Sequence, residues 1–512
     1  MALPQTQCDL KFSSSQMLAG TDDGIDGSSP TGDWNMSDIS SEPRSIETLA
    51  PFRHSPEQHT AIPARVRGEV PSWLQGEVLR TCPVLFDTSG WHAQHWFDGL
   101  GMIYAFRIQP PAVDFRSRLL DSEAAREASL GTAELATFGT PSERALWRRV
   151  LKPVPRASDN ANVNILKFGD DLVALTESDR QHLIDPETLA SLGYLDYGND
   201  ALHGAMMTAH PHLDFERNRV VNLAVQFGRQ VTVSAYAHGP ASRKRDVIGT
   251  WRTNRVPYIH AFGLTPRHVI LVAHPFAAAP LDMPFSNRAY IDHFQWRPED
   301  GTRLVLIDRA TGAVREHVTE AFFAFHTVNA YEHEGDTVLD LLAYPDADIV
   351  RELRVDHMLA RLPELRPALT RIVMTPGVER ARSEPLSSVG FEFPATNQRR
   401  VSGQAYRFAW GASNGAQPGG SYGSAIVKAD LQRGETRTFS HDTHIFGEPL
   451  FVARPQGDGE DDGVLLSVGA AQDEASSMLA IIDAKTLALL ASAEVPSLIP
   501  LGFHGSFQRS GG

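Results

Sequence analysis

The sequence predicts an all-β protein, and a β-propeller with helical and loop insertions capping one face is the best-fitting architecture. Short apolar segments recur along the chain and turn residues bound them, as in RVVNLAVQFG (219–228) and DTVLDLLAYP (336–345). Forty Gly and 33 Pro supply the turns that many short strands need. A two-sheet sandwich fits less well, because so many hairpins would overfill it.

Several of these segments pair as strand, tight turn and strand. FGDD (168–171) and RATG (309–312) are turn sequences flanked by β-branched residues. The phrase IDPETLASLG (184–193) returns near the C-terminus as IDAKTLALLA (482–491). Such irregular repetition of one hairpin plan is what successive propeller blades produce.

The chain divides into a short polar segment and one long domain. Residues 1–50 are rich in Ser, Asp, Gly and Pro and are predicted to be a disordered tail. Residues 51–512 run on without a low-complexity linker and are predicted to form a single domain. Helices are expected only in a few insertions, such as 122–130 and 357–365.

Composition and charge exclude several classes of function. The formal charge is −15, and the one short basic run, 243–245, is expected to be a solvated loop, so nucleic acid is not an expected partner. The chain has no phosphate-binding loop, G-x-S-x-G elbow, C-x-x-C pair or dinucleotide fingerprint. No obligate protein partner is indicated either.

Two features predict a cytoplasmic protein that at most touches a membrane. The two cysteines, Cys8 and Cys82, are too few to staple a chain of this length, which fits a reducing compartment. The first residues, MALPQTQCDLKF, lack the features of a signal peptide, and no run of eighteen apolar residues is present.

Most of the 20 histidines need no special explanation. Those in polar loops are expected to be exposed, and His54, His59, His238 and His293 are examples.

Four other histidines each close an apolar run that should be a buried strand: His210, His260, His326 and His504. A buried imidazole must find partners for both ring nitrogens, so four of them suggest a shared metal centre assembled from different blades. The alternative is that each one is an ordinary core histidine with its hydrogen bonds satisfied. Spacing alone leaves both interpretations open.

Three carboxylates occupy comparable places: Glu177, Glu392 and Glu448. A buried glutamate is costly unless it is paired. One possible partner is the N–H of a metal-bound imidazole, and the other is an arginine such as Arg407.

Several segments resemble those of the carotenoid cleavage oxygenase family. HWFDGLGMIYAF (95–106), TAHPH (208–212), VNAYEHEGDTVLDLLAYPD (328–346) and GEPLFVARP (447–455) occur in the order that the family has. The resemblance extends from about Ala64 to Phe507.

The resemblance implies a seven-bladed propeller with Fe(II) bound by His210, His260, His326 and His504. It also implies that a glutamate orients each of three ligands, while His210 has no such partner. The implied pairs are Glu177 with His260, Glu392 with His326 and Glu448 with His504. His95 is not a ligand in the family and is given a structural role, with Asp98-Gly99 as a hairpin turn.

The reaction implied is cleavage of a conjugated C=C bond of a carotenoid or apocarotenoid by O2, which gives two carbonyl products. Two motifs depart from the family pattern: His260 is followed by Ala261 instead of the usual Asp, and R-N-G-P reads RTCP (80–83). These departures leave open a stilbene-cleaving oxygenase and a retinoid isomerohydrolase. A protein-binding propeller without catalysis is the alternative from another class.

An apolar polyene also requires an apolar tunnel and a route to it. Trp91, Phe97, Phe262 and Phe503 are candidates to line the tunnel. The stretches 129–141, 145–151 and 275–285 could form a nonpolar lip on a membrane surface, or could be ordinary buried elements.

Overall fold

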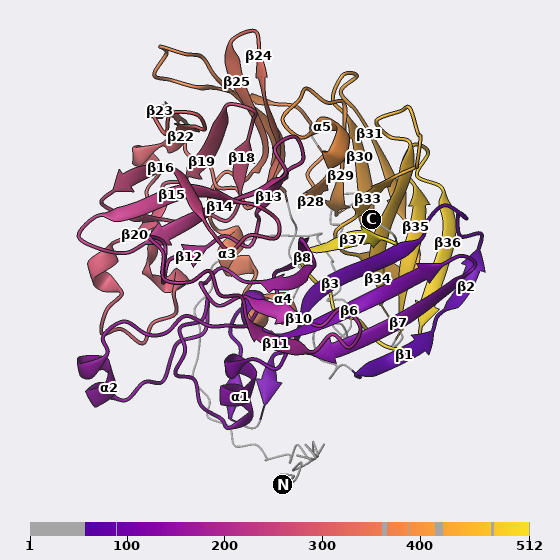
Figure 1. Cartoon of the computed structure of the whole chain (residues 1–512), viewed down its shortest axis with the longest axis horizontal. Helices are drawn as coiled ribbons and strands as arrows, with labels where there is room; N and C mark the ends of the chain where they lie inside the picture. Colours follow the sequence, from indigo (N-terminus) through magenta and orange to yellow (C-terminus); the bar gives the residue numbers. More distant parts are fainter. Residues whose placement is uncertain are drawn as a thin grey trace, which may run out of the picture. The chain divides into compact units, whose positions relative to one another are not determined.

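The computed structural model is built mainly of β-strands with few short helices, which confirms the all-β class (Figure 1). It describes residues 57–510 except 89, 361–365, 388, 415–422 and 473–475. The predicted disordered tail, residues 1–50, lies outside the described residues, as does Cys8. Seven antiparallel sheets of four or more strands, numbered here in chain order, make up most of the described chain.

Sheet 1 brings described N-terminal strands together with the last strand of the chain, while sheets 2 and 3 are each formed by one continuous part of it. Sheet 1 contains, in hydrogen-bonding order, β1 (His59–Pro63), β7 (Ala112–Leu119), β6 (Leu100–Gln109), β3 (Gly76–Leu85) and β37 (Gly505–Arg509). Sheet 2 contains β11 (Ser191–Tyr194), β10 (His182–Ile184), β9 (Asp171–Leu175) and β8 (Asn164–Phe168). Sheet 3 contains β12 (Met206–Met207) and β13 (His212–Asp214), both on β14 (Arg219–Gln226), then β15 (Val231–His238) and β16 (Asp246–Thr253).

The next three sheets are four-stranded, and each is formed by one continuous part of the chain. Sheet 4 contains β18 (Phe262–Leu264), β19 (His268–Ala273), β22 (Thr302–Asp308) and β23 (Val314–Thr319). Sheet 5 contains β24 (Thr327–His333), β25 (Asp336–Ala343), β26 (Ala368–Met374) and β27 (Arg382–Pro385). Sheet 6 contains β28 (Glu392–Ala395), β29 (Phe408–Ser413), β30 (Ala425–Asp430) and β31 (Glu435–Ser440).

Sheet 7 again combines distant parts of the chain. It contains β2 (Arg65–Gly68), β36 (Leu489–Val495), β35 (Ser477–Asp483) and β34 (Gly463–Ala471), on which β32 (His444–Phe446) and β33 (Leu450–Ala453) both pair. Strand β2 from the N-terminal side thus extends a sheet of C-terminal strands, while β37 extends sheet 1. These two exchanges tie the described beginning of the chain to its end.

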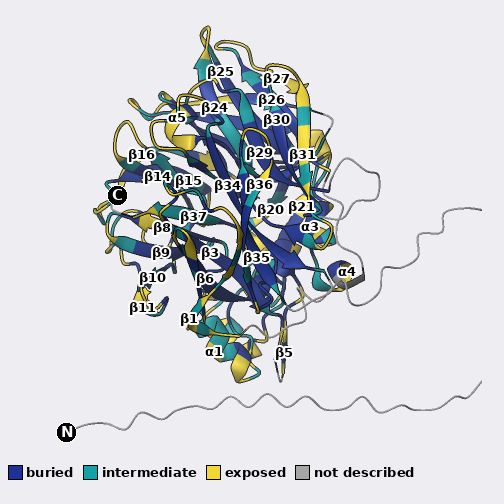
Figure 2. Ribbon diagram, turned by 90° about the vertical axis from the view of Figure 1, so that its right-hand side faces the viewer, coloured by how far each residue is buried: buried dark blue, intermediate teal, exposed yellow. Residues whose placement is uncertain are grey.

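Each sheet packs on the next one along the chain through an apolar layer. In β25, Leu339 and Leu341 belong to the layer with sheet 4, while Val338 and Leu342 belong to the layer with sheet 6. This alternation follows from the two-residue period of a strand, and both faces are buried. It explains why the strands read as continuous apolar runs, and Figure 2 shows such strands as largely buried. Sheet 7 packs on sheet 1 through a layer of its own.

The repeated hairpin phrases form one kind of turn. In each, an Asp side chain accepts hydrogen bonds from the backbone N–H and the hydroxyl of a Thr three residues later. The residue after that Thr has a positive φ of 57° to 71°. The Asp–Thr pairs are Asp185–Thr188, Asp308–Thr311 and Asp483–Thr486. The predicted strand–turn–strand plan is therefore confirmed, and FGDD (168–171) likewise joins β8 to β9.

Helices and small sheets occupy the insertions between strands. The helix α1 begins at Glu123, where Ser122 caps it, so this predicted helix is confirmed; the second predicted helix begins at Val355, and 361–365 lie outside the described residues. Within the described residues, no helix is long and apolar enough to cross a membrane. The helices are α1 (Glu123–Ser129), α2 (Leu146–Leu151), α3 (Ile349–Glu352), α4 (Val355–Ala360), α5 (Gln398–Val401), and the 3-10 turns η2 (Trp96–Asp98), η3 (Pro280–Asp282), η4 (Ile291–His293) and η5 (Pro298–Asp300). The small sheets contain β4 (Asp87–Thr88) with β5 (Trp91–His92), and β17 (Val256–Pro257), β20 (Phe276–Ala278) and β21 (Phe294–Trp296).

The apolar layers predict where a cavity would be most damaging. Leu339 is fully buried between sheets 4 and 5, so Leu339→Ala is expected to lower the free energy of unfolding by about 2–5 kcal/mol. Leu489→Ala, at a leucine that is 40% exposed on β36, is the matched control and should cost less than about 1 kcal/mol. Chemical denaturation of both variants measures the difference. Equal losses would mean that the layer is not packed as described.

Candidate metal centre

The four histidines come from strand ends in different sheets and meet at one point. His210 lies between β12 and β13, and His260 lies between β17 and β18. His326 immediately precedes β24, and His504 immediately precedes β37. Each therefore stands where a hydrogen-bonded ladder is interrupted or begins, which frees its side chain to turn inward. The four ligand nitrogens all lie within 4.8 Å of one another.

A glutamate accepts a hydrogen bond from the Nδ1 atom of three of these rings. Glu392 Oε2 lies 2.6 Å from His326, and Glu448 Oε1 lies 2.7 Å from His504. Glu177 Oε1 lies 2.5 Å from His260. Among the described residues, no carboxylate contacts the ring of His210.

Arg407, the arginine suggested from the sequence as a salt-bridge partner for the glutamates, does not pair with any of the three. Arg407 immediately precedes β29, and its guanidinium pairs with Asp430 at the end of β30, at 2.6 and 2.8 Å. All three glutamates face an imidazole with one carboxylate oxygen, and Glu448 also pairs with an arginine, Arg80.

These hydrogen bonds decide which ring nitrogen faces the centre. Because Nδ1 of His260, His326 and His504 donates to a carboxylate, a neutral ring presents a bare Nε2 with its lone pair. Burial lowers the pKa of His326 to about 4, although the charge of Glu392 opposes it. Burial and the neighbouring histidines hold the pKa values of His210 and His504 well below their ordinary value, so the rings of His210, His326 and His504 favour the neutral form that binds metals.

The distances between the Nε2 atoms fit a shared cation. Nε2 of His210 lies 2.9 Å from Nε2 of His260, and Nε2 of His326 lies 3.0 Å from Nε2 of His504. In the His326–His504 pair both nitrogens are bare, and two lone pairs at that distance repel each other. Two donors bound at right angles to one ion by bonds of about 2.1 Å would be about 3.0 Å apart. The site therefore has the donor set and spacing of a four-nitrogen metal site.

Arg80 supports the Glu448–His504 pair from behind. Its buried guanidinium donates to the carbonyl oxygens of Glu448 and Phe503, and Nη2 lies 3.3 Å from Glu448 Oε2. Burial raises the pKa of Glu448 to about 7, and the positive charge of Arg80 opposes this rise. The apolar surroundings of Glu448 favour the protonated carboxyl group, and the positive charge of Arg80 favours the ionised carboxylate.

Strain in the backbone accompanies the Glu392–His326 pair. The backbone of Phe393 has a φ of +55°, a value that residues other than Gly rarely adopt. Its ring lies against His326 and His504, with centroid distances of 5.3 and 5.1 Å. The strained residue therefore helps to hold two of the imidazoles.

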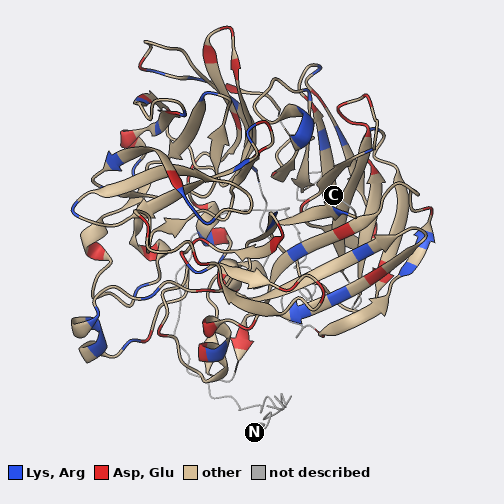
Figure 3. Ribbon diagram, viewed as in Figure 1, with Lys and Arg blue, Asp and Glu red and all other residues tan. Residues whose placement is uncertain are grey.

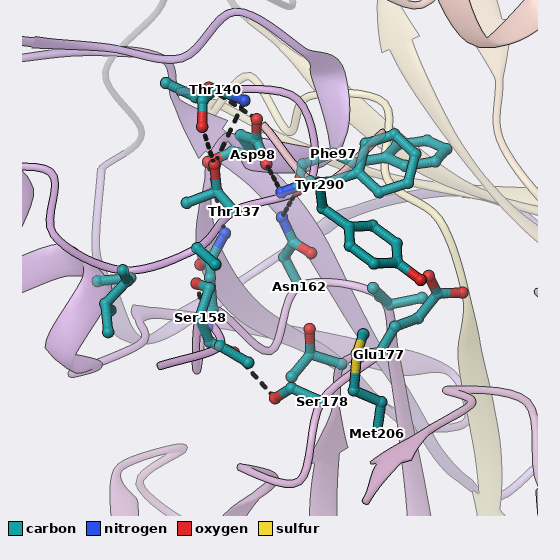
Figure 4. Close-up of a pocket in the computed structure, with 18 of the residues that line it drawn as sticks. Phe97, Asp98, Thr137, Thr140, Ser158, Asn162, Glu177, Ser178, Met206 and Tyr290 are labelled. Carbon is teal, nitrogen blue, oxygen red and sulfur yellow. Dashed lines mark hydrogen bonds between the residues drawn. The ribbon is translucent and has the colours of Figure 1, made fainter. Parts of the chain in front are cut away.

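A cavity of about 270 Å³ leads to this centre, and His260, His326, His504 and Glu177 form part of its wall. Figure 4 shows several of the residues that line it. Of the aromatic residues proposed for a tunnel, Trp91, Phe97 and Phe503 line the cavity. Phe262 does not: it packs in the layer between sheets 3 and 4, since it lies beyond His260 on β18. Further aromatic rings in the wall are Trp96, Phe138, Phe227, Tyr290, Phe325, Tyr344 and Phe393.

The hairpin turn predicted at Asp98-Gly99 is wrong. Asp98 ends the 3-10 turn η2, and its buried carboxylate accepts hydrogen bonds from the backbone N–H groups of Phe138 and Gly139 and from the Thr140 hydroxyl (Figure 4). Burial raises the pKa of Asp98 to about 6, and these hydrogen bonds oppose the rise. Asp98 therefore holds the cavity wall at 138–140.

His95, for which a structural role was expected, lies next to this turn. Its Nε2 is 2.9 Å from the carbonyl oxygen of Val350, and its Nδ1 accepts from the backbone N–H of Phe97. The ring thus joins η2 to the α3 segment.

The sequence argument also misjudged three of the four histidines that it expected to be exposed, while His54 lies outside the described residues. His59 is half-buried on β1. His238 lies buried on β15, and His293 is buried at the end of η4 and lines the cavity. The signal for His293 was present in its neighbours, because Ile291 and Phe294 flank it and are both buried. Arg80 was also not identified as a supporting residue.

Comparisons with known proteins agree with this site. The sequence profile of the family described as retinal pigment epithelial membrane protein matches residues 50–509. The chain belongs to this family, the carotenoid cleavage oxygenases. A carotenoid isomerooxygenase of Galleria mellonella is 30% identical over 86% of this chain and 92% of its own length.

Two further family members extend the comparison. A mitochondrial carotenoid-cleaving dioxygenase of Macaca fascicularis is 28% identical over 91% of this chain and 95% of its own length. The crystal structure of a cobalt-substituted apocarotenoid oxygenase from Synechocystis aligns with a TM-score of 0.80 at 26% identity, covering 91% of this chain and 99% of that one. The family likeness and the four-histidine group together indicate an oxygenase with a metal cofactor.

Two substitutions separate direct ligation from orientation. His260→Ala removes a donor nitrogen and should abolish stoichiometric metal binding, whereas Glu448→Gln leaves four nitrogens and should weaken metal affinity by about 10–100-fold. Metal content by mass spectrometry after anaerobic loading, and titration against a chelator, give the two readouts.

His317→Ala serves as the control, because this buried histidine binds the Val378 carbonyl outside the cluster. Full metal content in His260→Ala, or equal loss in His317→Ala, would contradict the assignment.

Proposed function

We propose that the protein is an Fe(II)-dependent dioxygenase that cleaves a conjugated C=C bond of a carotenoid or apocarotenoid with O2 to give two carbonyl compounds. The single observation that carries this proposal is a largely apolar cavity whose wall includes three of the four clustered histidines. Both atoms of O2 end in the products, one on each carbon of the broken bond. The names of the carotenoid-cleaving relatives support this reaction class.

In this proposal the four histidines bind iron and the three glutamates fix the rings that bind it. Iron would supply the activation of O2. The protein's own part is to exclude water and to hold the polyene at the centre, and the rings of Phe97, Phe325 and Phe503 are suited to both tasks. The proposed cleavage requires no nucleophilic side chain from the protein. The same four nitrogens would also suit Zn(II) or Cu(II), so the choice of iron rests on the family.

We also infer a seven-bladed β-propeller, with residues 51–512 as its single domain. The seven sheets and the apolar layer between each successive pair support this arrangement, as does the layer between sheets 7 and 1. Residues 44–512 cluster as one compact unit. In a propeller the strand ends that carry the histidines would face a common axis.

We propose that the protein works in the cytoplasm and touches a membrane at the edge of the cavity. Leu146, Trp147 and Leu151 on α2 are exposed, as are Leu281 and Phe285. The two segments lie side by side, because Phe285 N–H donates to the Pro153 carbonyl. Val154 is exposed and also lines the cavity, so an apolar substrate could enter there directly from lipid.

The charges near this edge agree with a lipid surface. Figure 3 shows basic residues on α2, which are Arg148 and Arg149, beside the apolar ones. The stretch 129–141, proposed from sequence as part of the lip, mostly lines the cavity instead, although Leu130 is exposed.

Membrane contact predicts a loss of vesicle binding when the lip is made polar. Trp147→Ser combined with Leu281→Ser should reduce co-sedimentation with phosphatidylcholine–phosphatidylglycerol vesicles by at least about fivefold, because it removes two apolar anchors from the interface. Leu489→Ser is the control, since this exposed leucine lies on β36. Equal binding of all three proteins would count against the lip.

Incubation of the iron-loaded protein with β-carotene, an apocarotenal and a stilbene tests the reaction itself. We expect O2 uptake and two aldehyde fragments from at least one polyene, identified by chromatography and mass spectrometry. Fragments from the stilbene alone would favour the stilbene-cleaving alternative. A retinyl ester converted without O2 uptake, with its carbon skeleton intact, would instead identify an isomerohydrolase. Absence of both metal and turnover after anaerobic iron loading would leave the protein-binding propeller.

A further inference from the structure

One wall of the cavity carries two polar side chains on a single turn. Tyr290 precedes the 3-10 turn η4, and His293 ends it. Residues three apart on such a turn project on the same side, and both residues line the cavity. The turn is held in place because the backbone N–H groups of Tyr290 and Ile291 donate to the carbonyls of Thr137 and Phe138.

Tyr290 places a hydroxyl group close to the metal centre. Figure 4 shows its ring directed toward Glu177, the residue that accepts from His260. Burial and the charge of Glu177 raise the pKa of Tyr290 far above its ordinary value, so the phenol keeps its proton. Within the described part of the chain this hydroxyl makes no hydrogen bond. It is a donor that the protein does not use.

His293 is similarly unpartnered. Its side chain is buried, with 6% of the residue exposed, and Nδ1 is shielded from solvent without a hydrogen-bond partner. Neither ring nitrogen is bonded to another described residue. Nε2 is not shielded in this way, so it is the ring nitrogen that a ligand in the cavity can reach. A polar group left unpaired in an apolar wall is unfavourable, and it indicates a partner that arrives with a ligand.

Several other polar side chains in the cavity wall differ from Tyr290 and His293, because they already make hydrogen bonds within the protein. Thr137 and Ser178 donate to carbonyl oxygens, and Thr140 donates to Asp98. Asn160 and Asn162 both donate to the carbonyl of Gly99. A ligand in the cavity therefore meets mainly rings, aliphatic groups and polar groups that the protein already satisfies. The Tyr290 hydroxyl and the His293 ring are among the exceptions, together with the Thr176 hydroxyl and Glu392 Oε1.

We propose that Tyr290 and His293 form a polar subsite that binds an oxygen atom of the substrate, a hydroxyl or a carbonyl, so that the substrate is an oxygenated polyene. This inference rests on the proposed oxygenase function and narrows its substrate class. The Tyr290 hydroxyl donates to the substrate oxygen, and the imidazole donates to a carbonyl or accepts from a hydroxyl. A hydrocarbon carotene would leave both groups unpaired, which disfavours it.

Ligand binding without turnover tests the subsite. Trp91 and Trp96 line the cavity, so quenching of tryptophan fluorescence reports its occupation. The iron-loaded protein is titrated under argon with β-apo-8′-carotenal, the corresponding alcohol and the hydrocarbon of the same carbon skeleton. We expect Tyr290→Phe and His293→Leu each to weaken binding of the two oxygenated ligands by about three- to tenfold and to leave hydrocarbon binding unchanged.

Tyr331→Phe is the matched control, because it removes a buried phenol between sheets 5 and 6, outside the cavity wall. Tyr290→Phe keeps the ring and its packing on Phe294, so a folded variant is available even if His293→Leu does not fold. An unchanged preference for oxygenated ligands in Tyr290→Phe overturns the proposal.

The outcome is separate from that of the proposed function. If the protein cleaves no polyene but Tyr290→Phe loses the preference, the subsite stands without the reaction. If the protein cleaves hydrocarbon and oxygenated polyenes equally well, and the variants bind all ligands alike, the reaction stands and the subsite is wrong.

Discussion

The hydrogen bond between a glutamate and Nδ1 of a histidine is the interaction on which the candidate centre depends. It fixes the tautomer, and the tautomer decides that bare Nε2 atoms converge. Without it, a neutral ring could present either nitrogen, and the close approach of His326 to His504 would be an ordinary hydrogen bond. The carboxylates must themselves be held, which Arg80 does for Glu448. The strained backbone at Phe393 likewise follows directly on Glu392.

The sheets supply what this interaction needs, which is rigid placement of residues far apart in sequence. Strands buried on both faces leave little freedom to shift, because a slip of one residue would exchange the two apolar layers. His210 and Glu448 show how the ladder is adapted: each stands in a gap between two short strands that pair with one longer neighbour. The strand segments on either side keep their pairing, and the gap alone turns inward.

Much of the fold followed from sequence because local patterns carried it. The Asp–Thr hairpins and the apolar runs are short-range signals, and they predicted strands that the structure contains. The prediction that four histidines converge rested on their expected burial at strand ends. The family resemblance was needed to predict that Glu177 pairs with His260. Asp98 was misjudged because its surroundings come from a loop distant in sequence, whereas His293 was misjudged although the apolar residues Ile291 and Phe294 lie beside it. Asp98 accepts hydrogen bonds from residues 138–140, and no local sequence pattern near HWFDG predicts that contact.

The place of His504 has a consequence for biosynthesis. This residue immediately precedes β37, which pairs with β3 near the described N-terminal side of the chain. A nascent chain can present His210, His260 and His326 long before His504 has left the ribosome. Three nitrogens would hold a metal less firmly than four, so under the proposed four-histidine binding secure loading would wait until β37 has paired with β3. The order of translation would then set when the metal can be retained.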